Sequence, residues 1–283
     1  MSQPLLAFAQ PSPAAAPFAT LYYLFRSEAS VVEGIERADI GQIRFMLNGA
    51  GSVTFPDGRC ERSTPVMIHG PGTGAARYRV EGPFHCFGVA LRPIGWGALV
   101  GLPAHERADH LTDGATIFGD GMVALIDRLR AADDVEAMKA IVEPALLAHA
   151  RPIPDAHHRL AEAVRQWLAS DGPICVDGLF ARVALSPRQV TRWVNHYFGA
   201  PPKFLERKFR AVRAASDLVE GADPAEVAGR FYDQSHMIRE IRHFTGHTPG
   251  TLASAIDPVL ALTLQSTAFN ELAPVTAPPH AAG

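Results

Sequence analysis

The chain reads LSPRQVTRWVNHYFG from Leu185 to Gly199, directly after VDGLFARVA from Val176 to Ala184. A second stretch of the same kind begins about 47 residues later, where DPAEVAGRF at 223–231 precedes YDQSHMIREIRHFTG at 232–246. Each pair predicts a short helix, a tight polar turn and a second helix with polar and basic residues on one side. This is the helix-turn-helix geometry that lets a helix enter the major groove of DNA.

In the first unit, Ser186 stands where a helix N-cap belongs, with Pro187 at the first helical position. Val190, Trp193 and Val194 fall on one face and should pack against partner helices. Arginine on the opposite face can bond both acceptors of guanine. The alternative, that these are ordinary solvated positions of a surface helix, is equally open for the helix alone. Our candidate DNA contacts here are Ser186, Arg188, Gln189, Thr191, Arg192 and Asn195.

In the second unit, Asp233 is the expected N-cap, and Met237, Ile241 and Phe244 form the expected buried stripe. Glutamine suits adenine, and arginine suits guanine or phosphate. The candidate DNA contacts of this unit are Gln234, Ser235, His236, Arg239 and Arg242. A long helix at 201–220 joins the units, and its Lys203, Arg207 and Lys208 should touch phosphate, or else form a solvated charged face with Glu206.

Composition bounds the class of protein. The 283 residues are 47% hydrophobic and 19% charged, which predicts two packed domains. Net charge is −3, so the global basic balance typical of nucleic-acid binders is absent. Residues 156–256 nevertheless carry 13 Lys and Arg against 10 Asp and Glu. Three widely spaced cysteines indicate neither a disulfide framework nor a zinc motif and fit a reducing cytoplasm. We expect no signal peptide and no membrane span.

The fold class we expect is α+β. Residues 1–17, rich in Ala and Pro, should be poorly ordered. Residues 18–150 should form a β-rich module, a barrel or sandwich of the cupin-like kind, with helices at 119–150. Its strand candidates are 18–25, 43–48, 52–55, 65–69 and 84–91, with turns at 49–51 and 56–59. The Pro-rich segment 151–154 marks the boundary to an all-α domain at 156–256, and 257–283 is a tail.

One apolar stripe in the first of these helices has two interpretations. Met122, Leu125, Ile126 and Leu129 recur at helical spacing. The stripe forms a dimer contact, or it packs on the β-rich module.

The C-terminal motifs resemble those of the AraC/XylS family of bacterial transcription regulators. The resemblance rests on LSPRQ at 185–189, on Phe198-Gly199 followed by Pro202, on DQSH at 233–236 with Arg239-Glu240, and on GHTP at 246–249. It implies two helix-turn-helix units that contact successive major-groove segments. Carried over, Arg188, Thr191 and Arg192 match base-reading positions of the first unit, and Gln234, His236 and Arg239 those of the second.

The chain departs from this family at two turns. The usual turn glycine is Ala184 in the first unit and Arg230 in the second. Since glycine is favoured where φ is positive, each change should cost about 1 kcal/mol or shift the turn. Ile241 also stands where an aromatic residue is more usual. The segment from Leu91 to Pro103 is similar, more loosely, to one seen in the sensor regions of several such regulators.

The sequence gives little support for a metal site or an enzyme active site. The set His69, His85, Cys86, His105 and His110 lacks the spacing of a known metal motif, and His85 and Cys86 should point to opposite faces of one strand. No nucleophile elbow, phosphate loop or dinucleotide fingerprint is present.

We therefore expect a cytoplasmic, non-enzymatic transcription regulator without a cofactor or metal. Its partners would be double-stranded DNA, a small-molecule effector of unknown identity, a second copy of the chain in a homodimer, and RNA polymerase. The alternatives are a cupin-like metalloenzyme with a helical appendage and a partner-binding protein with a degenerate DNA-binding domain.

Overall fold

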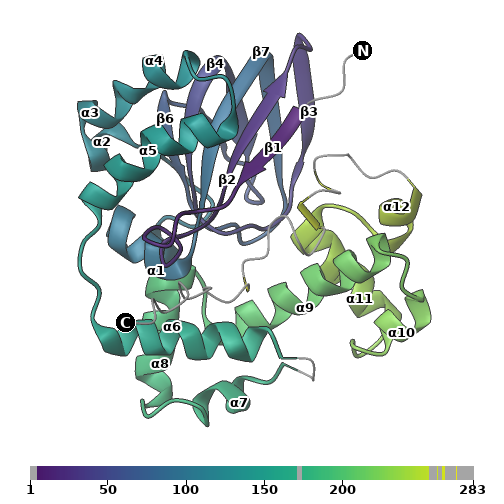
Figure 1. Ribbon diagram of the computed structural model, residues 1–283. Helices are drawn as coiled ribbons and strands as arrows, with labels where there is room; N and C mark the ends of the chain where they lie inside the picture. Colours follow the sequence, from purple (N-terminus) through teal and green to yellow (C-terminus); the bar gives the residue numbers. More distant parts are fainter. Residues whose placement is uncertain (1–4, 171–173, 255–259, 261–262, 265–271, 273–283) are drawn as a thin grey trace, which may run out of the picture.

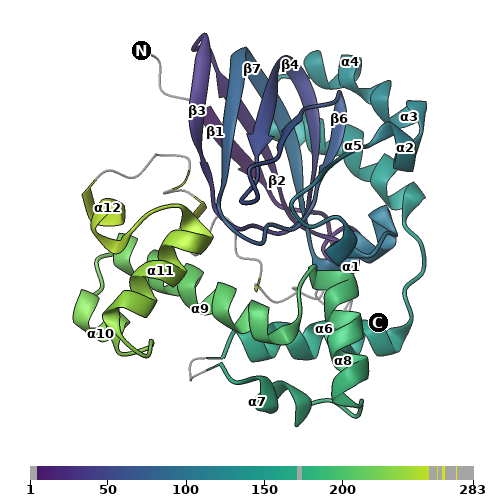
Figure 2. The ribbon, with the colours of Figure 1, turned by 180° about the vertical axis from the view of Figure 1, so that it is seen from behind.

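The computed structural model describes residues 5–170, 174–254, 260, 263–264 and 272. A curved antiparallel sheet with helices on one face forms the N-terminal part, and helices alone form the C-terminal part beneath it (Figures 1 and 2). This is the α+β organisation that the sequence predicts. Within the described residues, no helix is both long and apolar enough to cross a membrane.

Long strands β4 and β7 form the centre of the sheet. The path through it is β1-β2-β7-β4-β6-β8, while β3 pairs with β7 and β5 with β4. Both faces of β2 and of the second half of β7 are largely buried, because helices cover one face and the other lines a cavity. Tyr22 and Leu24 of β2 accordingly belong to the core beneath the helices, and Tyr23 and Phe25 face the cavity. The strands are β1 Leu5–Ala9, β2 Ala19–Ser27, β3 Val31–Glu36, β4 Gln42–Thr54, β5 Cys60–Arg62, β6 Val66–His69, β7 Ala76–Leu91 and β8 Leu111–Asp113.

Two expectations about the sheet are wrong. Residues 5–9, predicted to be poorly ordered, form β1, which pairs with β2 along its whole length. The turn predicted at 49–51 lies inside β4, where the pairing with β7 shifts register on either side of Asn48. Gly49 has a φ of +74°, which lets the strand bulge and continue. The hairpin turn at 56–59 is confirmed, since Thr54 pairs with Cys60 and Gly58 has a φ of +85°.

The apolar stripe of the first helices packs on the sheet. Met122, Ile126 and Leu129 are each at most 5% exposed and share a core with Phe45 and other sheet residues. They are therefore not free to form a dimer contact. The helices that cover this face are α2 Ala115–Phe118, α3 Asp120–Val123, α4 Leu125–Arg130 and α5 Val135–His149; before them come α1 Pro93–Gly95, the π-helical turn η1 Trp96–Val100 and the 3₁₀ turn η2 Ala104–Glu106.

The helical domain has two small cores joined by one long helix. Leu160, Trp167 and Val194 belong to the first core, and Val227 and Ile241 to the second. Helix α9 contributes to both. The helices are α6 Asp155–Leu168, α7 Val176–Phe180, α8 Pro187–Phe198, α9 Pro202–Val219, α10 Pro224–Ala228, α11 Gln234–Thr245 and α12 Pro249–Ser254. Most of the tail predicted at 257–283 lies outside the described residues.

Candidate DNA-binding face and sheet cavity

Helix α8, which carries the predicted DNA contacts of the first unit, begins with a reciprocal cap. The hydroxyl of Ser186 accepts from the backbone N–H of Gln189 at 3.3 Å, and the side-chain oxygen of Gln189 accepts from the N–H of Ser186 at 3.1 Å. The helix ends at Gly199, whose φ is +84°. Ser186 and Gln189 are exposed, but their side chains are engaged in starting the helix.

The outer face of α8 presents two arginines. Arg188 and Arg192 are exposed, and Thr191 between them is half-buried. The Arg192 guanidinium lies 4.6 Å from the ring centre of Trp193, which holds its stem against the helix. Asn195, one turn further, is half-buried, and its side-chain oxygen has no hydrogen-bond partner in the described structure. The two exposed guanidinium groups thus lie in the first half of the helix.

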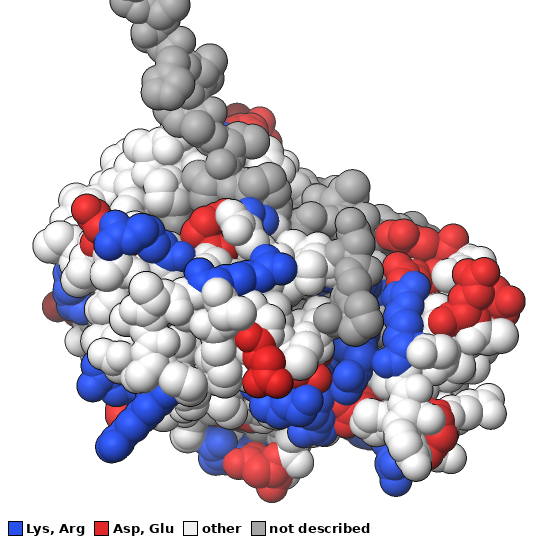
Figure 3. Space-filling view, turned by 90° about the horizontal axis from the view of Figure 1, so that it is seen from below, with Lys and Arg blue, Asp and Glu red and all other residues white. Residues whose placement is uncertain are grey.

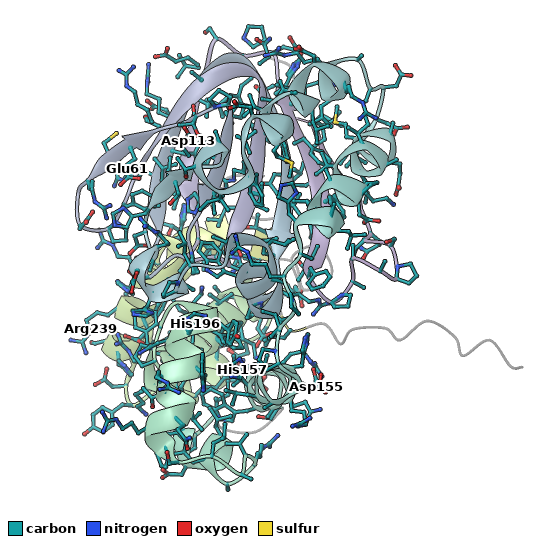
Figure 4. The ribbon with its side chains drawn as sticks, turned by 90° about the vertical axis from the view of Figure 1, so that its left-hand side faces the viewer. Glu61, Asp113, Asp155, His157, His196 and Arg239 are labelled. Atoms are coloured by element: carbon teal, nitrogen blue, oxygen red, sulfur yellow. The ribbon has the colours of Figure 1, made fainter. Side chains whose placement is uncertain are left out.

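The second recognition helix, α11, is capped by Asp233, whose carboxylate accepts from the N–H of His236 at 2.7 Å. His236 is half-buried, packing edge-on against Phe231. Arg239 points outward at the edge of the helical domain (Figure 4). Four of the predicted contacts on this helix are exposed: Gln234, Ser235, Arg239 and Arg242.

The three predicted phosphate contacts on α9 differ in their surroundings. Lys203 is 72% exposed and pairs with Glu206 at 2.7 Å. Arg207 donates two hydrogen bonds to Glu240 of α11, at 3.0 and 2.7 Å, and these raise the pKa of Arg207. Lys208 is only 4% exposed, and its ammonium donates to the carbonyl of Asp39 at 2.8 Å. Lys208 therefore contacts the sheet domain and does not face solvent.

The two turns without glycine are not strained in the way expected. Asp109 is the one non-glycine residue with positive φ in the described part of the chain. Neither Ala184 nor Arg230 therefore adopts the conformation that would require glycine, and the predicted cost is absent. Arg230 also gains a partner, because its guanidinium pairs with Asp217 of α9.

The N-terminal ends of α8 and α11 lie on the same side of the molecule, away from the sheet (Figures 1 and 2). Their C-terminal ends face the sheet domain: α8 contacts η2, and the carbonyl of Phe244 in α11 accepts from the N–H of Ala38 at 2.7 Å. Seen from below, this side carries Lys and Arg in several groups with Asp and Glu between them (Figure 3). The charge is mixed, as the near-balanced composition of the domain predicts.

A cavity lies inside the curve of the sheet. It contains about 890 Å³ of atom-free space, including its opening, and residues of seven strands line it. Its walls are mainly apolar, and of their residues only Cys86 was singled out from the sequence, as a member of the candidate metal set. We call it the sheet cavity; the wall is formed by Leu6, Phe25, Ile35, Met46, Val53, Met67, Tyr78, Val80, Phe84, Cys86, Leu111 and Leu260.

One end of the sheet cavity is polar. Arg44 pairs with Glu36 at 2.8 Å, and its Nε donates to Tyr23 Oη at 2.9 Å and to Gln42 Oε1 at 3.0 Å. The amide of Gln42 donates to Asp39 at 3.1 Å. Burial alone would raise the pKa of Glu36, but Arg44 and His69 lower it to about 2. The one available sequence signal was Arg44, a charge inside the apolar run at 43–47.

The residues that close this polar end also contact the helical domain. Glu36, Arg37 and Asp39 line the cavity, while Ala38 between them is fully buried against Phe244 and Ala211. We call residues 36–39 the connecting segment. A second contact lies next to it, because the N–H of Ala75 donates to the carbonyl of His243 at 2.8 Å.

The histidines and the cysteine that were considered as metal ligands contact different partners. Cys86 lines the cavity and His85 pairs with Glu28 outside it, so the two do lie on opposite faces of β7. His69 lies 3.4 Å from Glu36, and His110 contacts Glu61 at 3.0 Å. In the described residues no three His, Cys, Asp or Glu side chains form a group that could hold a metal ion. Figure 4 places Glu61 and His196 in different halves of the molecule.

Comparison with known proteins adds the following. Residues 8–113 match a family model described as a domain of unknown function, DUF6597. No curated protein matches the sequence significantly. Among solved structures, the chain is similar to ToxT from Vibrio cholerae O395, at 9% identity and a TM-score of 0.45, over 83% of this chain and 98% of that one.

Two further solved structures are similar to the chain. Wild-type ToxT with an unsaturated fatty acid bound, from Vibrio cholerae strain SCE256, matches at 10% identity and a TM-score of 0.45, over 89% of this chain and 97% of that one. CuxR, described as an AraC-like transcriptional activator, matches at 12% identity and a TM-score of 0.32, over 81% of this chain and 93% of that one. CuxR is thus described as the kind of regulator that the C-terminal motifs resemble.

Proposed function

We propose that the chain is a sequence-specific DNA-binding transcription regulator of the AraC/XylS type, whose N-terminal domain responds to a small ligand. One observation carries the DNA-binding part. Two capped recognition helices sit at the two ends of one long helix, and both direct their N-terminal ends away from the sheet domain. DNA-binding helices contact base edges mainly through such ends.

The residues on those ends have separate roles in the proposal. Arg188 and Arg192 of α8 read guanine, and Gln234 and Arg239 of α11 read adenine and guanine. Lys203 meets phosphate, since its ammonium is exposed beside α8. Lys208 is not among the proposed phosphate contacts, because it is buried against the sheet domain.

The ligand-responsive part of the proposal rests on the connecting segment. Its side chains form the polar end of the sheet cavity, and its backbone bonds to α9 and α11. Leu260 makes a second link, as it lines the cavity and belongs to the core of the second helix-turn-helix unit. A ligand that favours one position of these residues shifts the placement of the recognition helices.

Selection from random duplex DNA by the purified chain at physiological salt tests the proposal. We expect enrichment of two short motifs about one helical turn apart. Enrichment of one motif would restrict base reading to one unit. Weak, salt-sensitive binding without enrichment would contradict sequence-specific recognition and favour a partner-binding protein.

Substitution of Arg188 assigns the first motif to α8. Arg188→Ala should weaken binding to the selected site by about 1–3 kcal/mol and relax the preference at one base pair. Arg128→Ala is the control, because Arg128 is exposed on α4, beside the sheet. An equal effect of both substitutions would show that general charge, and not base reading, produces the affinity.

A further inference from the structure

The polar end of the sheet cavity has no excess charge. Glu36 lies 2.8 Å from Arg44, and Asp39 lies 3.3 Å from Arg37. All four residues line the cavity, so each cation has its own carboxylate. Burial raises the pKa of Cys86 to about 12 and also raises that of Tyr23, so these two lining groups are neutral near pH 7.

This balance disfavours a charged ligand. A carboxylate that approached Arg44 would also approach Glu36, and an ammonium that approached Glu36 would also approach Arg44. Either ion would be removed from water without a counter-ion of its own, which is unfavourable. An uncharged polar group avoids that cost.

Arg44 still has a donor to offer. Its Nη2 pairs with Glu36, and its Nε donates to Tyr23 and Gln42. Its Nη1 makes no hydrogen bond or ion pair within the described part of the chain. A ligand oxygen that accepts from this N–H would complete the hydrogen bonding of the guanidinium.

The rest of the cavity suits an apolar body. Phe25, Met46, Met67, Val80 and Phe84 form one buried cluster along its wall, each at most 8% exposed. Two methionines among them allow the wall to adapt, because their thioether chains are unbranched and flexible. Apolar surface buried here would supply most of the affinity.

We propose that the sheet cavity binds an uncharged molecule with an apolar body and one oxygen acceptor, such as a ketone or an ester, directed at Arg44. The inference deepens the proposed function, on which it rests for the ligand's regulatory role. Binding itself needs no DNA and is measured without it.

Three ten-carbon probes of similar shape test the charge argument: 2-decanone, decanoate and decylamine. Calorimetric titration of the full chain without DNA should show 2-decanone binding at least about tenfold more tightly than either ion. Met67→Trp, which fills the wall, should abolish this binding, and Arg128→Ala should leave it unchanged. Tighter binding of decanoate or decylamine, or no binding of 2-decanone, would overturn the inference.

Changing the charge balance gives a second, independent result. Glu36→Gln removes the carboxylate beside Arg44, and decanoate should then bind more tightly than 2-decanone. Circular dichroism checks that the variant folds; should it not fold, the three probes on the unchanged chain still decide. DNA selection is a separate experiment from ligand titration. The titration can therefore contradict the proposed ligand class without contradicting DNA binding, and the selection can contradict DNA binding without contradicting the ligand class.

Discussion

Glu36 and Arg44 are the pair whose removal should show most clearly in stability. Their side chains are 24% and 12% exposed, and loss of the carboxylate leaves a largely buried guanidinium without its partner. Glu36→Gln should lower the free energy of unfolding at pH 7 by roughly 3 kcal/mol. Glu33→Gln, which breaks an exposed pair with Arg79, should cost less than about 0.5 kcal/mol in the same urea titration.

The same pair has a pH signature. The pKa of Glu36 is about 2 in the folded chain against 4.5 ordinarily, so its stabilisation is complete above pH 4.5 and is lost as the pH falls toward 2. The stability difference between the unchanged chain and Glu36→Gln should therefore narrow between pH 4.5 and pH 3.5. A difference that stays constant over this range would refute the ion pair as its cause.

Two serines at the starts of recognition helices should behave differently. Ser186 completes the cap of α8, and Ser186→Ala should reduce the free energy of unfolding by about 1 kcal/mol. Ser235 in α11 is exposed, and it is Asp233 that caps this helix, so Ser235→Ala should stay within about 0.5 kcal/mol. Equal losses in urea titrations followed by circular dichroism would remove the cap as the explanation.

At the scale of elements, Lys208 joins α9 to the connecting segment. Lys208→Met keeps the apolar stem but removes the donor to Asp39 and Gly72. The amides of Ala38 and Ala75, which bond to α11, should then exchange hydrogen about tenfold faster, as one charge-assisted bond is lost. Lys203→Met, five residues earlier on the exposed side of α9, is the control for hydrogen-exchange mass spectrometry.

Faster exchange in Lys203→Met, or unchanged exchange in Lys208→Met, would show that the contact between the domains does not depend on this lysine. The outcome also bears on regulation. A contact that opens when one hydrogen bond is lost is one that a ligand at the cavity can bias.

The helices were more predictable from the sequence than the cavity. Caps and periodic stripes are local, so Ser186, Asp233 and the boundaries of α8 and α11 follow from residues a few positions apart. The sheet cavity assembles residues from strands far apart in sequence, and Arg44 meets Glu36 only after the sheet curls. The burial of Lys208 could not be predicted for the same reason. The sequence pattern of a helix does not distinguish a lysine that faces solvent from one that contacts another domain.

The strands and their pairing could be predicted only in part from the sequence, because they too depend on contacts between distant residues. β2 and the second half of β7, at 84–91, are buried on both faces, so they lack the alternation of polar and apolar residues that marks a half-exposed strand. A glycine pair in β4 then resembled a turn, although the long-range pairing with β7 carries the strand through it. Short β1 lay in a segment whose composition is typical of loops.

In the proposed complex with DNA, α9 sets the spacing between the two bound motifs. This helix has 18 residues, about 27 Å at 1.5 Å per residue, and it holds a helix-turn-helix unit at each end. Arg207 of α9 donates two hydrogen bonds to Glu240 of α11, so we expect the second unit to keep a fixed position on this helix. A rigid pair should accept one spacing between the two selected motifs and reject others.

Insertions between the motifs distinguish a rigid pair from a tethered one. Five added base pairs turn the second motif to the opposite face of the duplex, and binding should fall to that of one motif in an electrophoretic shift assay. Ten added base pairs restore the face but lengthen the separation by about one turn, roughly 34 Å, beyond what α9 can span. Affinity should stay low there as well. Recovery at ten base pairs would mean that the units move independently, and that α9 does not determine the operator.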